Sequence, residues 1–177
     1  AVSSNFNLLQ NMSDFNGSWA IASKALSYDY LWNTIRVQGG AYGCGFSASK
    51  TGSAGFYTYR DPNIASSLET ISKSGFWLKK FVASEREMDG YVVSAVADFD
   101  KPCKASALMA RAESQFFSGE TEEDRERLRD EALHTTLDDV RSLASTVENI
   151  LEHSSVCVVG NKDAISKSKK FDEITEL

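Results

Sequence analysis

A glycine-spaced segment, residues 35–45 (IRVQGGAYGCG), most constrains how this chain can fold. An apolar helical pattern ends here, and Gly39 and Gly40 stand where a helix needs a residue with positive φ to stop. Gly43 and Gly45 then alternate with larger residues at the period of a strand. We therefore expect a helix, a tight glycine turn and a strand with one nearly bare face that is open to another backbone.

An arginine and a tyrosine flank this turn. Arg36 falls in the last helical turn, and Tyr42 starts the strand on the same face as Cys44 and Phe46. Two interpretations remain open. A cation complements the dipole at a helix C-terminus and tyrosine is common in strands, so both residues can be structural. Alternatively, both side chains point at something that binds beside the turn.

Composition excludes several classes of protein. The 177 residues are 42% hydrophobic and 25% charged, as expected of one globular domain with a sizeable core. We expect a single domain, residues 1–177, taken from a longer protein. A formal charge of −6 without a basic block argues against nucleic-acid partners, and no apolar run is long enough to cross a membrane. Three widely spaced cysteines indicate neither a disulfide framework nor a cysteine zinc site.

Hydrophobic periodicity and cap residues predict the order of the elements. Strands are expected near residues 2–9, in a hairpin at 42–48 and 54–59, and at 156–159, where a continuous apolar run is typical of a central strand covered on both faces. Helices are expected around 21–35 and at 64–82, 84–100, 104–117, 122–134 and 137–152, followed by a short polar tail. This order predicts an α+β fold, a two-layer sandwich of a mostly antiparallel sheet with helices on one face. It excludes a doubly wound dinucleotide fold, which needs regular strand–helix alternation.

The titratable residues form no catalytic constellation in the sequence. Phosphate-binding glycine loops run from a strand into a helix, whereas the order here is the reverse. His134 and His153 lack a second ligand at helical spacing and are expected to be solvated, so no metal site is predicted. Cys44 is expected to face the core, where a thiol is usually inert.

The stretch 28–43 resembles the signature of the last domain of the presequence peptidases, which belong to the insulinase-like (pitrilysin) zinc metallopeptidases. The resemblance continues through 59–63, 98–102 and 119–123 and covers nearly the whole chain. It implies a domain of the type found in mitochondrial processing peptidase, within a peptidase of four related α+β domains that enclose a chamber. The zinc of such enzymes is held in the first domain by an inverted His-x-x-Glu-His helix, which this chain lacks.

The resemblance also implies roles for the turn residues. Arg36 and Tyr42 match the family positions that reach across the closed chamber to the bound peptide near the zinc. There they would donate hydrogen bonds to the substrate carbonyl as it becomes an oxyanion, while zinc activates the attacking water. The backbone beside them is expected to contact substrate at Gly39, Gly40, Ala41 and Gly43.

The sequence therefore predicts a substrate-binding, active-site-completing C-terminal domain of a zinc metalloendopeptidase that degrades unstructured peptides. The expected partners are peptide substrates and the other peptidase domains of the same chain, in a bacterial cytoplasm or an organelle matrix. The chain alone is expected to hold no zinc and to be inactive. The alternative is a non-catalytic structural or interaction domain of the same fold, as in the core subunits of respiratory complexes.

Overall fold

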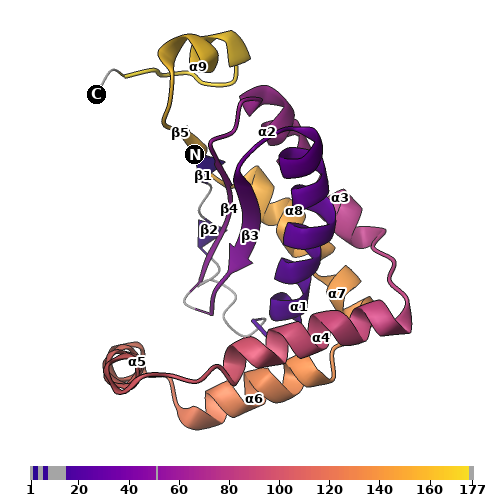
Figure 1. The fold of residues 1–177 in the computed structure, drawn as a ribbon, viewed down its shortest axis with the longest axis vertical. Helices are drawn as coiled ribbons and strands as arrows, with labels where there is room; N and C mark the ends of the chain where they lie inside the picture. Colours follow the sequence, from indigo (N-terminus) through magenta and orange to yellow (C-terminus); the bar gives the residue numbers. More distant parts are fainter. Residues whose placement is uncertain (1, 4–5, 8–14, 51, 176–177) are drawn as a thin grey trace.

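The computed structural model describes residues 2–3, 6–7, 15–50 and 52–175, arranged as Figure 1 shows. The strands are β1 (Val2–Ser3), β2 (Phe6–Asn7), β3 (Gly43–Ala48), β4 (Ser53–Tyr59) and β5 (Cys157–Val158). The α-helices are α1 (Ser18–Lys24), α2 (Ile64–Ser72), α3 (Ser74–Lys79), α4 (Glu85–Phe99), α5 (Ala105–Ser118), α6 (Glu122–Leu133), α7 (Leu137–Ser142), α8 (Ala144–Glu152) and α9 (Lys162–Ser168), and η2 (Ala25–Gln38) is a π-helix. The fold is α+β, as the sequence predicts.

One continuous helix, α1 followed by η2, lies at the centre of the molecule and confirms the helix expected around 21–35. Its second part differs from the prediction, because it is wound as a π-helix. At its end the N–H of Gly39 donates to the carbonyl of Thr34, five residues back, at 3.0 Å. The helix is covered on more than one side, and its buried apolar side chains are Trp19, Ile21, Ala22, Ala25, Leu26, Leu31 and Ile35.

β3 and β4 pair as the predicted antiparallel hairpin. Their register runs from Gly43 opposite Tyr59 to Ala48 opposite Ala54. β2 pairs with the other side of β4, so the sheet order is β2-β4-β3 and β3 lies at its edge. The α1–η2 helix packs on this edge, and it is the element from which the candidate site is built.

The last strand corrects one prediction. β5 pairs antiparallel with β1, with Val158 opposite Val2, and not with the hairpin among the described residues. Cys157 is exposed and Val159 is 64% exposed, so the expectation of a central strand covered on both faces is wrong. A short apolar run does not reveal by itself how many layers cover it. The predicted first strand, near 2–9, contains β1 and β2, and residues 4–5 and 8–9 lie outside the described residues.

Two helices predicted as continuous are each divided. The 64–82 segment bends at Lys73 (φ −93°, ψ 1°) into α2 and α3, and the 137–152 segment bends at Leu143 into α7 and α8. α3 then lies against α8, where a Cβ on Gly75 would be only 2.4 Å from the Glu148 side chain. This close approach is a tertiary constraint that helical periodicity does not contain.

Side-chain caps begin the helices where the sequence predicts them. α4, α6 and α7 each open on a capping box, in which the first side chain and the third-position carboxylate satisfy each other's backbone N–H groups. The three pairs are Ser84 with Glu87, Thr121 with Asp124 and Thr136 with Asp139. These hydrogen bonds lower the pKa of each of the three carboxyl groups.

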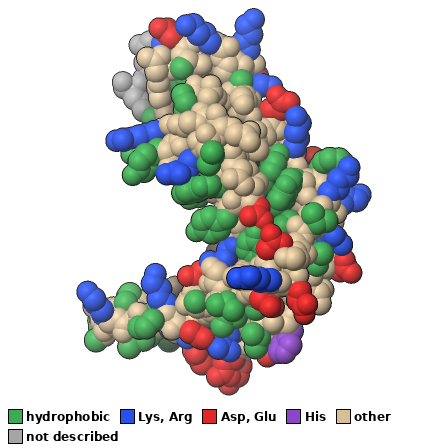
Figure 2. Space-filling view, turned by 45° about the vertical axis from the view of Figure 1, so that its right-hand side comes forward, with side chains coloured by type: hydrophobic (Ala, Val, Ile, Leu, Met, Phe, Trp, Pro, Cys, Tyr) green, Lys and Arg blue, Asp and Glu red, His purple; other side chains and the backbone are tan. Residues whose placement is uncertain are grey.

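α4 and α6 lie side by side at the base of the molecule, and α5 projects away from them (Figures 1 and 2). Figure 2 shows that the face between this arm and the hairpin is hollowed. The expected polar tail contains a further helix, α9, which the Asn161 side chain caps by accepting from Ala164 N–H at 3.1 Å. No described helix combines the length and the apolar character that a membrane span requires.

Candidate functional site at the glycine turn

The glycine turn joins η2 to β3, and its backbone conformation is tightly constrained. Gly40 has φ +77°, a conformation that favours glycine, while Gly39 has an ordinary φ of −85°. Gly39 is required for space instead, because a Cβ there would lie 2.6 Å from the Ile35 carbonyl oxygen. The Asn63 side-chain amide donates to the Gly39 carbonyl at 2.7 Å and ties the turn to the start of α2. The turn is therefore a rigid support.

Arg36 is held by two contacts within this support. Its Nε donates to the Tyr42 carbonyl oxygen at 3.0 Å, and its guanidinium carbon lies 3.9 Å from the centroid of the Trp32 ring. The ring lies one helical turn earlier and attracts the cation through its π face. No hydrogen bond of the two terminal guanidinium nitrogens is found among the described residues. Four of the five N–H donors are thus available to a ligand.

Tyr42 is 66% exposed and stands beside the same turn. Its N–H donates to the Tyr59 carbonyl at 3.0 Å, and the two rings meet edge to face with centroids 5.9 Å apart. The guanidinium carbon of Arg60 lies 5.8 Å from the Tyr42 ring centroid and 5.4 Å from the Tyr59 ring centroid. Arg60 adopts φ +49°, which is uncommon for a side chain larger than glycine and tends to occur at functional sites. The Tyr42 ring is therefore positioned from two sides.

Behind the turn lie a carboxylate and a thiol. Asp61 accepts from Asn63 N–H through Oδ1 at 2.9 Å, while Oδ2 is buried without a hydrogen-bond partner among the described residues. Cys44 is buried, as predicted, and burial raises the pKa of its thiol, with a further contribution from the charge of Asp61. Such a thiol stays protonated and is a poor nucleophile near neutral pH.

The expectation of a bare strand face is only half right. The Tyr57 ring crosses from the facing position on β4 and covers Gly45, where a Cβ would lie 2.9 Å from a ring carbon. At Gly43 the nearest atom to a Cβ would be 4.0 Å away, so this position alone stays open. A glycine opposite an aromatic residue is a common cross-strand arrangement, because the ring fills the space that the missing side chain leaves.

The structure places Arg36 beside Tyr42, with the Arg36 Nε donating to the Tyr42 backbone carbonyl. The predicted role of the two side chains in contacting a peptide stays a prediction. The turn backbone offers a substrate fewer contacts than the sequence predicts. Its N–H groups already donate to helix carbonyls, and Ala41 is buried. These N–H groups belong to Gly39, Gly40 and Ala41. Sequence reasoning missed Trp32 and Arg60. The spacing of four residues between Trp32 and Arg36 on one helix was a usable signal.

No group of three or more His, Cys, Asp or Glu side chains that could hold a metal is found within residues 15–50 and 52–175 or the short described segments before them. His134 and His153 lie exposed at the ends of α6 and α8. The fold and the turn together define a class: an α+β domain with an arginine and an exposed tyrosine side by side at a glycine turn.

Comparison with known sequences identifies the family within this class. The family described as "PreP C-terminal domain" matches residues 1–162, and the chain belongs to it. This agrees with the resemblance to presequence peptidases that the glycine turn and its flanking segments indicate.

Several relatives are much longer than this chain. Protein HypA of Clostridium perfringens (strain 13 / Type A) is 33% identical over 155 residues, which are 88% of this chain and 16% of that protein. Presequence protease 1, chloroplastic/mitochondrial, of Arabidopsis thaliana is 28% identical over 154 residues, 86% of this chain and 14% of that protein. The mitochondrial presequence protease of Emericella nidulans is 31% identical, with the same coverage of 86% and 14%. The chain thus spans between 14% and 16% of the length of these relatives.

Proposed function

We propose that residues 1–177 form the last domain of a larger zinc metalloendopeptidase, where they bind peptide and complete an active site held by another domain. The family and the names of the presequence protease relatives support this assignment. One observation carries the role of this domain: Arg36 is anchored through Nε and Trp32, which leaves its terminal nitrogens free beside the exposed Tyr42. Peptides in extended, unstructured form are the proposed substrates.

The two side chains do different work in this proposal. The Tyr42 hydroxyl donates a hydrogen bond to the substrate carbonyl oxygen, which becomes an oxyanion in the tetrahedral intermediate. The Arg36 guanidinium binds peptide carbonyls through its free donors before and during the reaction. Because the turn fixes both groups in advance, little reorganisation is needed when charge develops on the substrate.

The described residues do not fit a zinc site, since they bring no three candidate ligands together. In this proposal the zinc belongs to another domain. The names of the relatives refer to mitochondria and chloroplasts, and one relative is bacterial, so we propose an organelle matrix or a bacterial cytoplasm as the compartment.

The helix α5 supports the membership of this domain in a larger enzyme. None of its residues is buried, and no other described element packs extensively against it. Its exposed large apolar side chains are Leu108, Met109, Phe116 and Phe117. Exposed apolar surface of this kind marks a contact with another protein surface, which we propose to be the other domains of the same chain.

The isolated chain should bind no stoichiometric zinc and cleave no peptide, because the part of it that the structure describes offers neither a ligand cluster nor a general base beside one. Metal analysis of the purified chain and a fluorogenic peptide assay measure this, with the full-length protein as the positive control. One tightly held zinc per isolated chain would contradict the proposal.

Changing Arg36→Lys in the full-length enzyme should lower kcat/KM roughly 10- to 100-fold, as expected for loss of a hydrogen bond to a charged group. Lysine keeps the charge but loses the planar fork that both stacks on Trp32 and donates to the Tyr42 carbonyl. Since the guanidinium contacts ground state and transition state alike, most of this loss should appear as a rise in KM. Steady-state kinetics with one short peptide measures this. Wild-type values of both constants would show that Arg36 is structural.

A further inference from the structure

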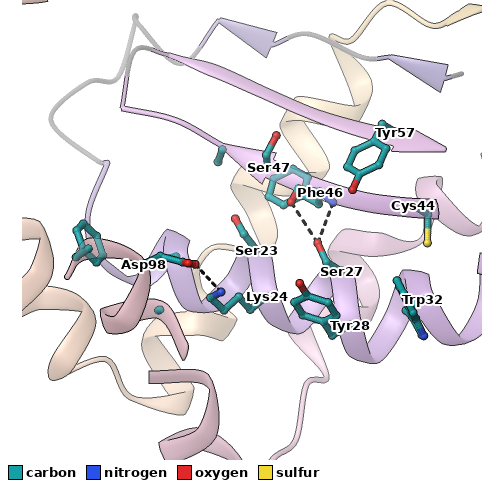
Figure 3. Close-up of a pocket in the computed structure, with 14 residues that line it drawn as sticks. Ser23, Lys24, Ser27, Tyr28, Trp32, Cys44, Phe46, Ser47, Tyr57 and Asp98 are labelled. Atoms are coloured by element: carbon teal, nitrogen blue, oxygen red, sulfur yellow. Dashed lines mark hydrogen bonds and ion pairs between the residues drawn. The ribbon is translucent and has the colours of Figure 1, made fainter. Parts of the chain in front are cut away.

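A groove of about 540 Å³ runs along the edge of β3, between this strand and the α1–η2 helix. Figure 3 shows Trp32 and Cys44 at one end of it, and Lys24 and Asp98 toward the other. Five aromatic residues line it together with small, mostly alanine and serine, side chains; the aromatic residues are Tyr28, Trp32, Phe46, Tyr57 and Phe99. The volume lies within the range of roughly 300–1,000 Å³ that is usual for sites that bind ligands.

The groove is continuous with the glycine turn through Trp32. This ring lines the groove and also holds the Arg36 guanidinium at 3.9 Å. A peptide whose backbone reaches Arg36 therefore passes the open end of the groove. The groove and the glycine turn therefore form one continuous surface.

The edge of β3 is not open to a complete added strand. An incoming strand would need the outward N–H and C=O groups of β3. At Phe46 both groups are already used, because the N–H donates to Ser27 Oγ at 3.0 Å and the Ser27 hydroxyl donates to the Phe46 carbonyl at 3.2 Å. Figure 3 shows Ser27 in this position between helix and strand. An added strand would lose these two hydrogen bonds in the middle of β3, which favours entry of a side chain over a backbone.

The charges in the groove indicate which side chain fits. Lys24 and Asp98 form an ion pair of 2.7 Å with each other, so neither offers an unpaired charge to an incoming group. A charged side chain would lose hydration here without gaining a counterion, whereas an aromatic or large aliphatic side chain would exchange water for ring contacts.

We propose that this groove is a side-chain pocket for a bulky apolar residue of the same extended peptide that Arg36 and Tyr42 contact. The inference rests on the proposed function and deepens it, because it assigns this domain a part in substrate selection. β3 rises about 3.3 Å per residue, so the groove extends roughly 13 Å from Cys44 to Ala48. The selected residue therefore lies about two to four positions from the carbonyl bound at the turn.

The test uses the full-length peptidase and a set of quenched fluorescent peptides of one length. In each peptide a single phenylalanine replaces alanine at successive positions of an uncharged background, and aspartate at the same positions reports the effect of charge. Ser47→Trp fills the groove from its exposed rim without changing a buried side chain. Ser66→Trp adds the same ring at an exposed position of α2 outside the groove and serves as the matched control.

The wild-type enzyme should prefer phenylalanine over alanine by roughly tenfold or more in kcat/KM at one or two positions near the cleaved bond, as expected for an apolar pocket. Ser47→Trp should abolish this preference through KM and leave the alanine peptide unaffected, while Ser66→Trp should retain it. If Ser47→Trp does not fold, Ser23→Leu fills the same groove from α1.

Two results would overturn the inference: a preference that persists in a folded groove-filling variant, or no positional preference in the wild type. A failure of the proposed function would give a different kinetic result from a failure of this inference. If the turn contacts substrate, Arg36→Lys slows phenylalanine and alanine peptides by the same factor, whereas filling the groove changes only the ratio between them.

Discussion

Tyr42→Phe should lower kcat of the full-length peptidase by roughly 10²–10³-fold, or about 2.7–4 kcal/mol, the usual effect of removing one oxyanion donor. The change deletes only a hydroxyl from a side chain that is 66% exposed. The ring keeps its edge-to-face contact with Tyr59 and its position under Arg60, so packing should not change. Steady-state kinetics on a peptide small enough for the chamber, with zinc content and thermal unfolding measured in parallel, gives the result.

A matched control lies beside it. Tyr59→Phe removes the same hydroxyl from the neighbouring ring, which is 50% exposed, and should leave kcat near the wild-type value. Equal effects of both substitutions would indicate a general disturbance of the hairpin end. If Tyr42→Phe keeps wild-type kcat and KM, the tyrosine is structural, and the alternative of a non-catalytic interaction domain becomes the better hypothesis.

Short-range signals in this sequence predict the structure well. The capping boxes and the hairpin depend on residues only a few positions apart, and both are where the sequence places them. The errors lie at long range. The bend at Lys73 brings α3 against α8 through Gly75, and β5 joins β1 instead of the hairpin. Both depend on partners about 70 to 150 residues distant, as Gly75 with Glu148 and Val2 with Val158 show.

In the candidate site, too, the sequence predicts short-range features and misses long-range contacts. Arg36 and Tyr42 stand out in the sequence because they flank a glycine turn, and the resemblance to presequence peptidases gives them a role that remains a prediction. The support around them was not foreseen. Tyr57 covers Gly45 only in the register that pairs the two residues, and Arg60 reaches Tyr42 only across the hairpin. The groove beside β3 could not be predicted either, because it depends on the hydrogen bonds between Ser27 and Phe46, which are 19 residues apart.

The second large effect is expected in the core, behind the turn. Ile71 is 5% exposed on α2, the helix whose start binds the Gly39 carbonyl through Asn63. Truncation to alanine removes buried methyl and methylene groups and leaves a cavity, so Ile71→Ala should destabilise the fold by about 2–5 kcal/mol. Urea-induced unfolding followed by circular dichroism measures the change.

Two further variants separate cavity formation from a general loss of helix. Ile71→Val removes one methylene and should cost only about 0.5–1.5 kcal/mol. Val93→Ala truncates a side chain that is 68% exposed on α4 and should stay within about 0.5 kcal/mol of the wild type. A small loss for Ile71→Ala, similar to that of Val93→Ala, would mean that α2 does not pack where the structure places it. The anchor that Asn63 gives the glycine turn would then lose its support, because its position depends on the same helix.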